Sequence, residues 1–172
     1  MSTPLSEQTG RFLHRPVATG PAYWGPGDHY TFLVTGEESG GAYFAMEALV
    51  PPGGGPPPHV HTREDETFYL LEGEIEFLLG AETILAGPGD FVHVPRGTVH
   101  RFLSTGTDTA RLVLTFTPAG IERWFEETLE PAPNEVRAED VPDNVEEVAA
   151  RYVATAARYG IEFVPPDPAA TS

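Results

Sequence analysis

The chain has 172 residues, 40% of them apolar, which is enough for one domain with a hydrophobic core of ordinary size. Its formal net charge of −16 argues against a nucleic-acid partner, because phosphate binding needs clustered basic side chains. All 10 basic residues are arginine and cysteine is absent, which excludes chemistry that needs a lysine nucleophile, a thiolate or a disulfide.

Residues 1–27 are expected to form an N-terminal arm. They are interrupted too often for a long helix or strand, by Pro16, Gly20, Pro21, Gly25, Pro26 and Gly27. The first residues lack the basic region and apolar run of a signal peptide. The sequence also lacks the roughly 18 continuous apolar residues that a membrane-spanning helix needs. We therefore expect a cytoplasmic protein with no membrane partner, and the absence of cysteine fits a reducing compartment.

Residues 28–118 are expected to form an all-β domain. Strand patterns cover residues 30–35, 43–50, 66–71, 74–79, 83–86, 91–94, 99–103 and 110–116. The clearest is 74–79, where Ile75, Phe77 and Leu79 share one face and Glu74 and Glu76 the other. Short strands separated by Gly-rich turns predict a closed antiparallel barrel or jelly roll, and closure hides the strand edges.

Residues 119–172 are expected to form a helical extension with a proline-rich tail. A first helix is predicted from the helical spacing of Ile121, Trp124, Phe125 and Leu129. A second is predicted from near Pro142 to Tyr159, ended by Gly160, with one apolar stripe that consists of Val145, Val148, Tyr152 and Ala156. The helices could cover one end of the barrel or take part in a dimer contact, and both alternatives stay open here.

Three histidines and a carboxylate form the most informative pattern. His59 and His61 are two residues apart, so their side chains lie on the same face of a strand. His100 follows a turn marked by Pro95 and Gly97. Imidazoles with one carboxylate suit a divalent ion such as Fe, Ni, Co, Mn, Cu or Zn, and leave it a net positive charge as a Lewis acid. The carboxylate could come from Glu66, or instead from Glu64 or Asp65.

Both segments around these ligands resemble sequence motifs of the cupin superfamily. Residues 53–73, GGGPPPHVHTREDETFYLLEG, are similar to the first motif at every marker. Residues 89–104, GDFVHVPRGTVHRFLS, are similar to the second, except that Ser104 stands where the family usually has asparagine. That position does not bind the metal, so the departure affects a loop contact. The resemblance implies a cupin jelly-roll β-barrel over about residues 28–118. It also implies one metal ion, bound by His59, His61, Glu66 and His100.

The chain also resembles single-domain, bacterial quercetin 2,3-dioxygenase-like cupins in its length and helical extension. This resemblance implies a metal-dependent dioxygenase that acts on a flavonol-like or other aromatic or enolic oxygenated small molecule. The substrate oxyanion would bind the metal, O2 would add to the ring, and Glu66 would be the base that accepts the hydroxyl proton. Alternatives are a non-redox metallocupin, such as a polyketide cyclase or isomerase, and a small-molecule-binding cupin without turnover. Cupins commonly pair, so a homodimer is expected.

Four aromatic residues and one histidine are predicted to line the substrate pocket: Tyr30, Phe32, Phe68, Phe77 and His93. Core packing is the alternative for each aromatic residue, because a barrel of this size needs such side chains to fill it. His93 could donate a hydrogen bond or act as an acid or base, or be held as a core histidine. His14 and His29 lie in turn-rich sequence and are expected to be exposed.

Overall fold

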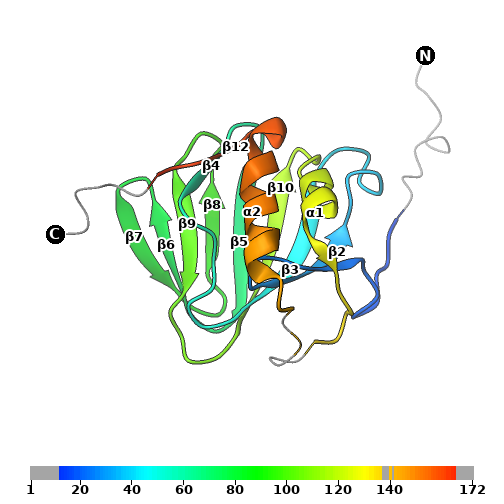
Figure 1. The fold of residues 1–172 in the computed structure, drawn as a ribbon, viewed down its shortest axis with the longest axis horizontal. Coiled ribbons are helices and arrows are strands. Elements are labelled where there is room, and N and C mark those ends of the chain that lie inside the picture. The colour runs from blue at the N-terminus through cyan, green and yellow to red at the C-terminus, as the bar shows by residue number, and fades with distance from the viewer. Residues whose placement is uncertain (1–11, 137–139, 141, 166–172) are drawn as a thin grey trace, which may run out of the picture.

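Two antiparallel sheets face each other in the computed structural model, which describes residues 12–136, 140 and 142–165 (Figure 1). The 7-stranded sheet has the order β11-β1-β2-β3-β10-β5-β8, and the 5-stranded sheet the order β12-β4-β9-β6-β7. The strands are β1 Ala22–Trp24, β2 His29–Val34, β3 Phe44–Val50, β4 His59–His61, β5 Asp65–Glu72, β6 Ile75–Leu79, β7 Glu82–Ala86, β8 Phe91–Val94, β9 His100–Ser104, β10 Ala110–Thr117, β11 Glu130–Pro131 and β12 Ile161–Phe163.

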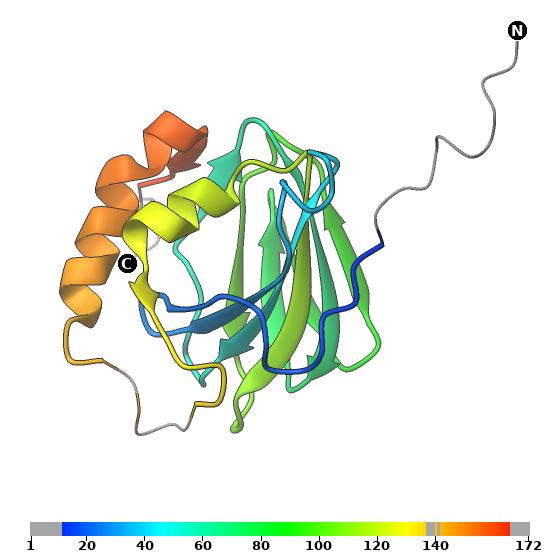
Figure 2. The ribbon, with the colours of Figure 1, turned by 90° about the vertical axis from the view of Figure 1, so that its right-hand side faces the viewer.

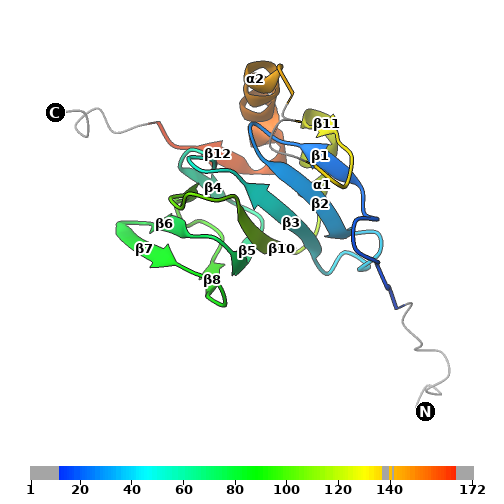
Figure 3. The ribbon, with the colours of Figure 1, turned by 90° about the horizontal axis from the view of Figure 1, so that it is seen from below.

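The predicted fold class, an all-β cupin jelly roll with a helical extension, is confirmed. The strands form two facing sheets that are not hydrogen-bonded into one closed barrel, and Figure 3 shows this arrangement from below. Every predicted strand is present, with ends that differ by only a few residues. The sequence patterns did not indicate β1 or β11 as strands, because segments of two or three residues are too short to show a period of two.

Strands from both flanking segments pair with the central sheets. β1, from the predicted arm, pairs with β2 and β11, and β12 pairs with β4. The boundaries predicted at residues 27 and 118 therefore separate strands that share a sheet. Residues 1–11 of the arm and 166–172 of the tail lie outside the described residues.

The helices lie side by side at one side of the sheets (Figure 2). They are α1 Glu122–Thr128 and α2 Val145–Thr155, which continues into the 3-10 turn η3 Ala156–Tyr159. The Trp124 ring stacks on the Tyr152 ring with 3.8 Å between centroids, and Phe125 packs on Tyr30 of β2. The predicted apolar stripes thus contact each other and the inner face of the larger sheet. Among the described residues, no helix is long and apolar enough to cross a membrane.

Alternating side chains fill the space between the sheets. On β10 the buried positions are Ala110, Leu112, Leu114 and Phe116, and the residues between them are half-buried. Phe116 stacks on Phe44 of β3 at 5.7 Å between ring centroids. Because side chains alternate between the two faces of a strand, this pattern leaves one wet and one packed face, as expected for sheets in a sandwich.

The Pro/Gly segment 51–58 passes close to β9 on its way to β4. Gly55 has φ +133°, and a Cβ atom there would lie 2.1 Å from the carbonyl oxygen of Phe102. Only glycine allows this approach, since any other side chain would push the segment away from β9. The position of His59 therefore depends on a glycine four residues before it.

Gly55→Ala is expected to lower the free energy of unfolding by roughly 3 kcal/mol or more, through backbone strain and the clash with Phe102. Gly53→Ala is the matched control: Gly53 also has a positive φ, +79°, but a Cβ would meet no atom within 4 Å. The control should cost only about 1–2 kcal/mol. Urea unfolding of both metal-free variants measures this, and equal losses would contradict the close approach.

Candidate metal centre

Both sheets contribute to one buried group of side chains. His59 and His61 come from β4 and His100 from β9, all in the smaller sheet, and Glu66 comes from β5 in the larger sheet. His59 and His100 are direct cross-strand partners. On β5, Glu66 is buried while its neighbours Asp65 and Thr67 are half-buried, so Glu66 faces the histidines. The chain bends at Thr62–Glu64 between the two sheets, as the spacing of the predicted ligands required.

The four candidate donor atoms lie within 4.8 Å of one another. The Nε2 atoms of His59 and His61 are 3.1 Å apart, and Glu66 Oε2 is 3.3 Å from His61 Nε2 and 2.8 Å from His100 Nε2. Atoms bound about 2.1 Å from one ion can be at most about 4.2 Å apart. The donor atoms therefore need to move by less than about 1 Å to bind a single metal ion. Three imidazoles and one carboxylate are also a donor set that suits a divalent ion.

The other nitrogens of these imidazoles face away from the group. His59 Nδ1 lies 3.0 Å from the carbonyl oxygen of Pro57, and His100 Nδ1 lies 3.0 Å from that of Thr98. A carbonyl only accepts, so each Nδ1 donates a proton, and the inward Nε2 is the nitrogen that would bind an ion after losing any proton it carries. His61 Nδ1 is buried, has no hydrogen bond to another described residue and lies 4.0 Å from Glu64 Oε2. Outer partners of this kind orient imidazole ligands at metal sites.

The geometry separates the three candidate carboxylates. Asp65 is turned outward and forms an ion pair with Arg96 at 2.9 Å. Glu64 is buried, but it faces the outer nitrogen of His61. Only Glu66 lies among the inward nitrogens. The structure thus brings together the set that the sequence motif implied.

Burial and mutual charge favour a neutral His59 and an ionised Glu66, whereas the hydrogen bond and charge of Glu66 outweigh burial at His100 and raise its pKa. Burial is the main cause that lowers the pKa of His59 to about 3, with the neighbouring imidazoles adding to it. Burial alone would raise the pKa of Glu66, but the charge of His61 and the hydrogen bonds from His100 and His61 outweigh it and hold this pKa at about 2. Metal binding requires a neutral imidazole and an ionised carboxylate, which His59 and Glu66 provide at neutral pH.

A small inner cavity lies beside the group. Its volume is about 20 Å³, and its lining includes His59, His61, Glu66 and the apolar side chains Met46, Phe102, Leu114, Phe116 and Phe125. An outer cavity of about 230 Å³ shares Tyr30, Pro56 and Tyr152 with it. The inner space admits about one water molecule. Only a protruding atom of a larger molecule could therefore reach the histidines, while its body would lie in the outer cavity.

The predicted pocket residues fall into three groups. Tyr30 lines both cavities. Phe32, Phe68 and Phe77 are core residues, at most 1% exposed, and line neither. The prediction for His93 was wrong: it lies opposite Thr67 on the outward face of β8 and is exposed, because Val92 and Val94 take the inward positions.

Other residues were missed or misplaced by the sequence patterns. Met46 and Leu114 share the inward parity of their strands, a signal that could have placed them in the cavity wall. Tyr152 was predicted on a helix stripe, but only the tertiary structure brings it to the metal group. His29, expected to be exposed, is 3% exposed and lies 2.9 Å from the carbonyl oxygen of Pro133 through Nε2.

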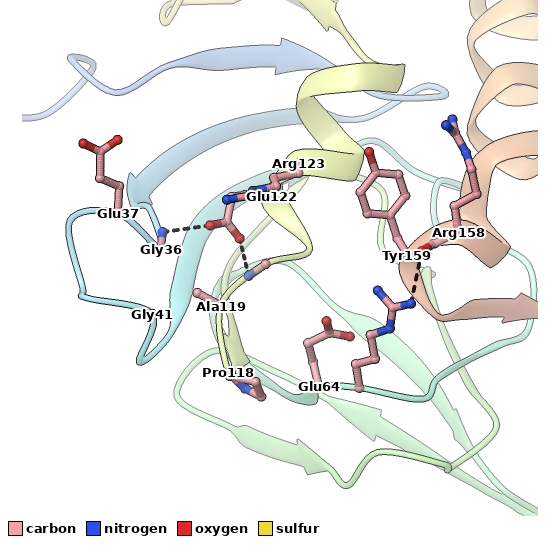
Figure 4. Close-up of a pocket in the computed structure, with 12 residues that line it drawn as sticks. Gly36, Glu37, Gly41, Glu64, Pro118, Ala119, Glu122, Arg123, Arg158 and Tyr159 are labelled. Atoms are coloured by element: carbon pink, nitrogen blue, oxygen red, sulfur yellow. Dashed lines mark hydrogen bonds between the residues drawn. The ribbon is translucent and has the colours of Figure 1, made fainter.

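A larger cavity, of about 780 Å³, lies elsewhere (Figure 4). It is open to solvent, and Arg63, Arg123, Arg158 and Tyr159 contribute to its wall. The Glu122 carboxylate accepts hydrogen bonds from the backbone N–H groups of Gly36 and Gly120 there. None of the four candidate ligands lines this cavity. Although this cavity is larger than the two beside the histidines, it is not the candidate metal site.

A family model described as the cupin domain matches residues 46–116, the segment that contains all four candidate ligands. The chain thus contains a cupin domain over these residues. In agreement, it is similar to an RmlC-like cupin from Shewanella frigidimarina, with a TM-score of 0.55 and 19% identity over 67% of this chain and 99% of that one. At this identity the similarity shows the fold alone.

Two curated relatives of this cupin have names that indicate enzymes. Quercetin 2,3-dioxygenase from Bacillus subtilis is 28% identical over 129 residues, which cover 70% of this chain and 38% of that protein. Oxidoreductase iacF from Pestalotiopsis fici is 37% identical over 62 residues, 36% of this chain and 30% of that protein. The cupin thus spans less than half the length of these relatives.

His59→Ala and His100→Ala are expected to lose most of the bound metal, since each removes one of four donors. His93→Ala is the matched control, because it removes an imidazole from the outer face of the sheets. Elemental analysis of protein purified without added metal measures the stoichiometry. Near-full metal in either ligand variant would rule out this ligand set.

A second carboxylate, Asp28, lines the outer cavity and has the opposite pKa shift from Glu66. Burial raises the pKa of Asp28 from 3.8 to about 7, although the hydrogen bond from Tyr30 opposes the shift. Between these two values the folded protein holds a proton that the unfolded chain releases. The stabilisation of the folded state by protonated Asp28 is therefore complete below about pH 4 and is lost as the pH rises to about 7.

Asp28→Asn is expected to be as stable as the wild type near pH 4 and more stable at pH 8, by up to roughly 4 kcal/mol. The reason is that asparagine has no charge to bury. Urea unfolding of both proteins across this pH range, with a chelator present, gives the difference. A difference that does not change with pH would contradict the raised pKa.

Proposed function

We propose that this cupin is a metal-dependent dioxygenase that acts on a flavonol-like or other aromatic or enolic oxygenated small molecule. The observation that carries the proposal is the buried convergence of His59, His61, Glu66 and His100 beside an apolar cavity. The similarity to quercetin 2,3-dioxygenase over 70% of the chain supports the choice of reaction. The proposal includes one divalent ion as cofactor and O2 as co-substrate.

In this proposal the three imidazoles and Glu66 hold the ion, and the cavity wall selects and orients the substrate. A divalent ion bound there would act as a Lewis acid that makes a nearby substrate hydroxyl more acidic, and a redox-active one would also allow reaction with O2. Glu66 is the proton acceptor because it is ionised and, among the described residues, the only carboxylate that lines the inner cavity. Its low pKa makes it a weak base, so the transfer depends on a substrate hydroxyl that is itself acidic.

The surroundings of Glu66 favour such a transfer. Phe102, Phe116 and Leu114 exclude bulk water from the inner cavity. With few water dipoles nearby, charges in this space interact more strongly than they would in solvent. A flat ring can pack against the aromatic wall while one oxygen reaches the imidazoles.

We also propose a homodimer in the cytoplasm. Exposed apolar side chains support the dimer: Phe12 and Val17 in the N-terminal segment are 92% and 91% exposed, and Leu85 and Phe91 are 62% and 63% exposed. The members of each pair are close in sequence, and contiguous exposed apolar surface often marks a protein contact. The absence of cysteine supports a reducing compartment.

Protein loaded with iron, nickel, cobalt or manganese is expected to consume O2 when a flavonol such as quercetin is added. Zinc-loaded protein should bind the flavonol without O2 uptake, because zinc has no redox chemistry. An oxygen electrode measures the rate, and the change in flavonol absorbance measures binding. His93→Ala should keep the wild-type rate and His100→Ala should lose it.

Two other outcomes would replace the proposal. Conversion of substrate without O2 uptake would show a non-redox cupin, such as a cyclase or isomerase. Tight retention of the flavonol without conversion by any metal form would show a binding protein.

A further inference from the structure

The outer cavity has one polar feature besides its two tyrosines. Its lining consists of Pro26, Asp28, Tyr30, Gly55, Pro56, Pro57, Ala149, Tyr152 and Val153. Asp28 is therefore the sole charged or acidic group among these residues, in a wall that is otherwise proline, alanine, valine and aromatic. A wall of this kind suits an uncharged ring system, and an acid within it needs an explanation.

The Asp28 carboxyl is only partly satisfied by the protein. The side chain is 3% exposed, and Oδ2 accepts a hydrogen bond of 3.0 Å from the Tyr30 hydroxyl. Oδ1 is buried and has no hydrogen-bond partner among the described residues. A buried acceptor without a partner is costly, and more so when it carries charge. Asp28 thus lines the outer cavity with a carboxyl group that has one oxygen unsatisfied by any described residue.

A purely local role does not account for this carboxyl. The turn before β2 is closed by backbone groups, since Gly25 N–H donates to the carbonyl oxygen of Asp28 at 2.8 Å and Gly27 N–H to that of Gly25. The side chain of Asp28 takes no part in these bonds. At Gly54 a Cβ atom would lie 2.9 Å from Asp28 Oδ1, so a larger residue at that position would crowd this oxygen.

Tyr30 and Tyr152 connect Asp28 with the metal group. Both rings line the inner cavity beside Glu66 as well as the outer cavity beside Asp28. Burial raises the pKa of Tyr152 well above its ordinary value, and the charges of Glu66 and Asp28 add to this shift. The two tyrosines thus border both cavities, the inner one lined by Glu66 and the outer one by Asp28.

We infer that Asp28, oriented by Tyr30, is a specificity-determining anchor that accepts a hydrogen bond from a hydroxyl on the part of the substrate remote from the metal group. The inference rests on the proposed function, because it takes the substrate to span both cavities. It narrows the substrate class to neutral, flat molecules with at least two separated hydroxyl groups. A carboxylate or phosphate at the remote end is disfavoured, since the described residues of the cavity lining include an acid and no basic side chain to pair with it.

The test compares two probes that differ in the remote hydroxyls. Quercetin carries hydroxyl groups on both ends of its ring system, whereas the parent flavonol keeps only the hydroxyl and carbonyl that would face the metal group. Binding of each to metal-loaded protein is titrated without O2, so that no turnover is needed. Wild type should bind quercetin roughly tenfold or more tightly than the parent flavonol, the usual effect of one hydrogen bond to a charged group.

In Asp28→Ala the ratio of the affinities for quercetin and for the parent flavonol is expected to fall close to one. The affinity for the parent flavonol and the metal content should stay within about twofold of the wild type. Asp28→Asn should retain part of the preference, because an amide oxygen still accepts a weaker hydrogen bond. It also keeps the shape of the side chain if the alanine variant folds poorly. Val153→Ala is the control in the same wall: it should weaken both probes equally and leave their ratio unchanged.

Several results would overturn the anchor. They are a wild type without preference, a preference that persists in Asp28→Ala, and failure of both flavonols to bind. Failure of the proposed function gives a different result. If the preference for quercetin is present in the wild type and lost in Asp28→Ala, but no O2 is consumed in air, the role of Asp28 stands and the dioxygenase is contradicted. If O2 is consumed but Asp28→Ala keeps the preference for quercetin over the parent flavonol, only the role of Asp28 is contradicted.

Discussion

The register of β5 determines whether this protein can have a metal centre at all. Glu66 is one strand position from Asp65 and Thr67, and a slip of one residue would turn it to the outer face. Several contacts fix the register. Glu66 lies opposite Phe116 on β10, and Asp65 Oδ1 accepts hydrogen bonds from the backbone N–H and the side-chain Nε of Arg96. At the end of β5, a Cβ at Gly73 would come within 2.7 Å of Ala110, so only glycine lets β10 start there. The carboxylate thus depends on features at both ends of its strand.

The three histidines are positioned by different means. His59 and His61 belong to a strand of three residues, which would be weak alone but is paired with β12 on one side and β9 on the other. In β12, Ile161 lies opposite His61 and Phe163 opposite His59. The end of the helical extension therefore supports the metal-ligand strand directly. This gives the extension a structural role in the site, in addition to its cover over the sheets.

Much of the site could be predicted from the sequence because its determinants are local. The spacing of His59 and His61, the turn before His100 and the parity of Glu66 on β5 are readable from short segments. His93 shows the limit of such reasoning. The side chain of a histidine in a four-residue strand can point inward or outward, and here Val92 and Val94 are the buried residues, so His93 points outward. Asp28 was not singled out because its importance depends on a helix more than 100 residues later in the chain, whose Tyr152 closes the cavity around it.

Glu66 and Asp28 show how one cavity system can hold two buried acids in different states. Burial by itself raises the pKa of both. Imidazoles offset it at Glu66, whose carboxylate stays ionised, whereas Asp28 has only the Tyr30 hydroxyl and its pKa rises to about 7. Two carboxyl groups with separated pKa values commonly divide the work of a site, one as base and one as hydrogen-bonding partner. Because the difference arises from the neighbours, a change at His100 or Tyr30 would alter the state of the adjacent acid without touching the carboxyl itself.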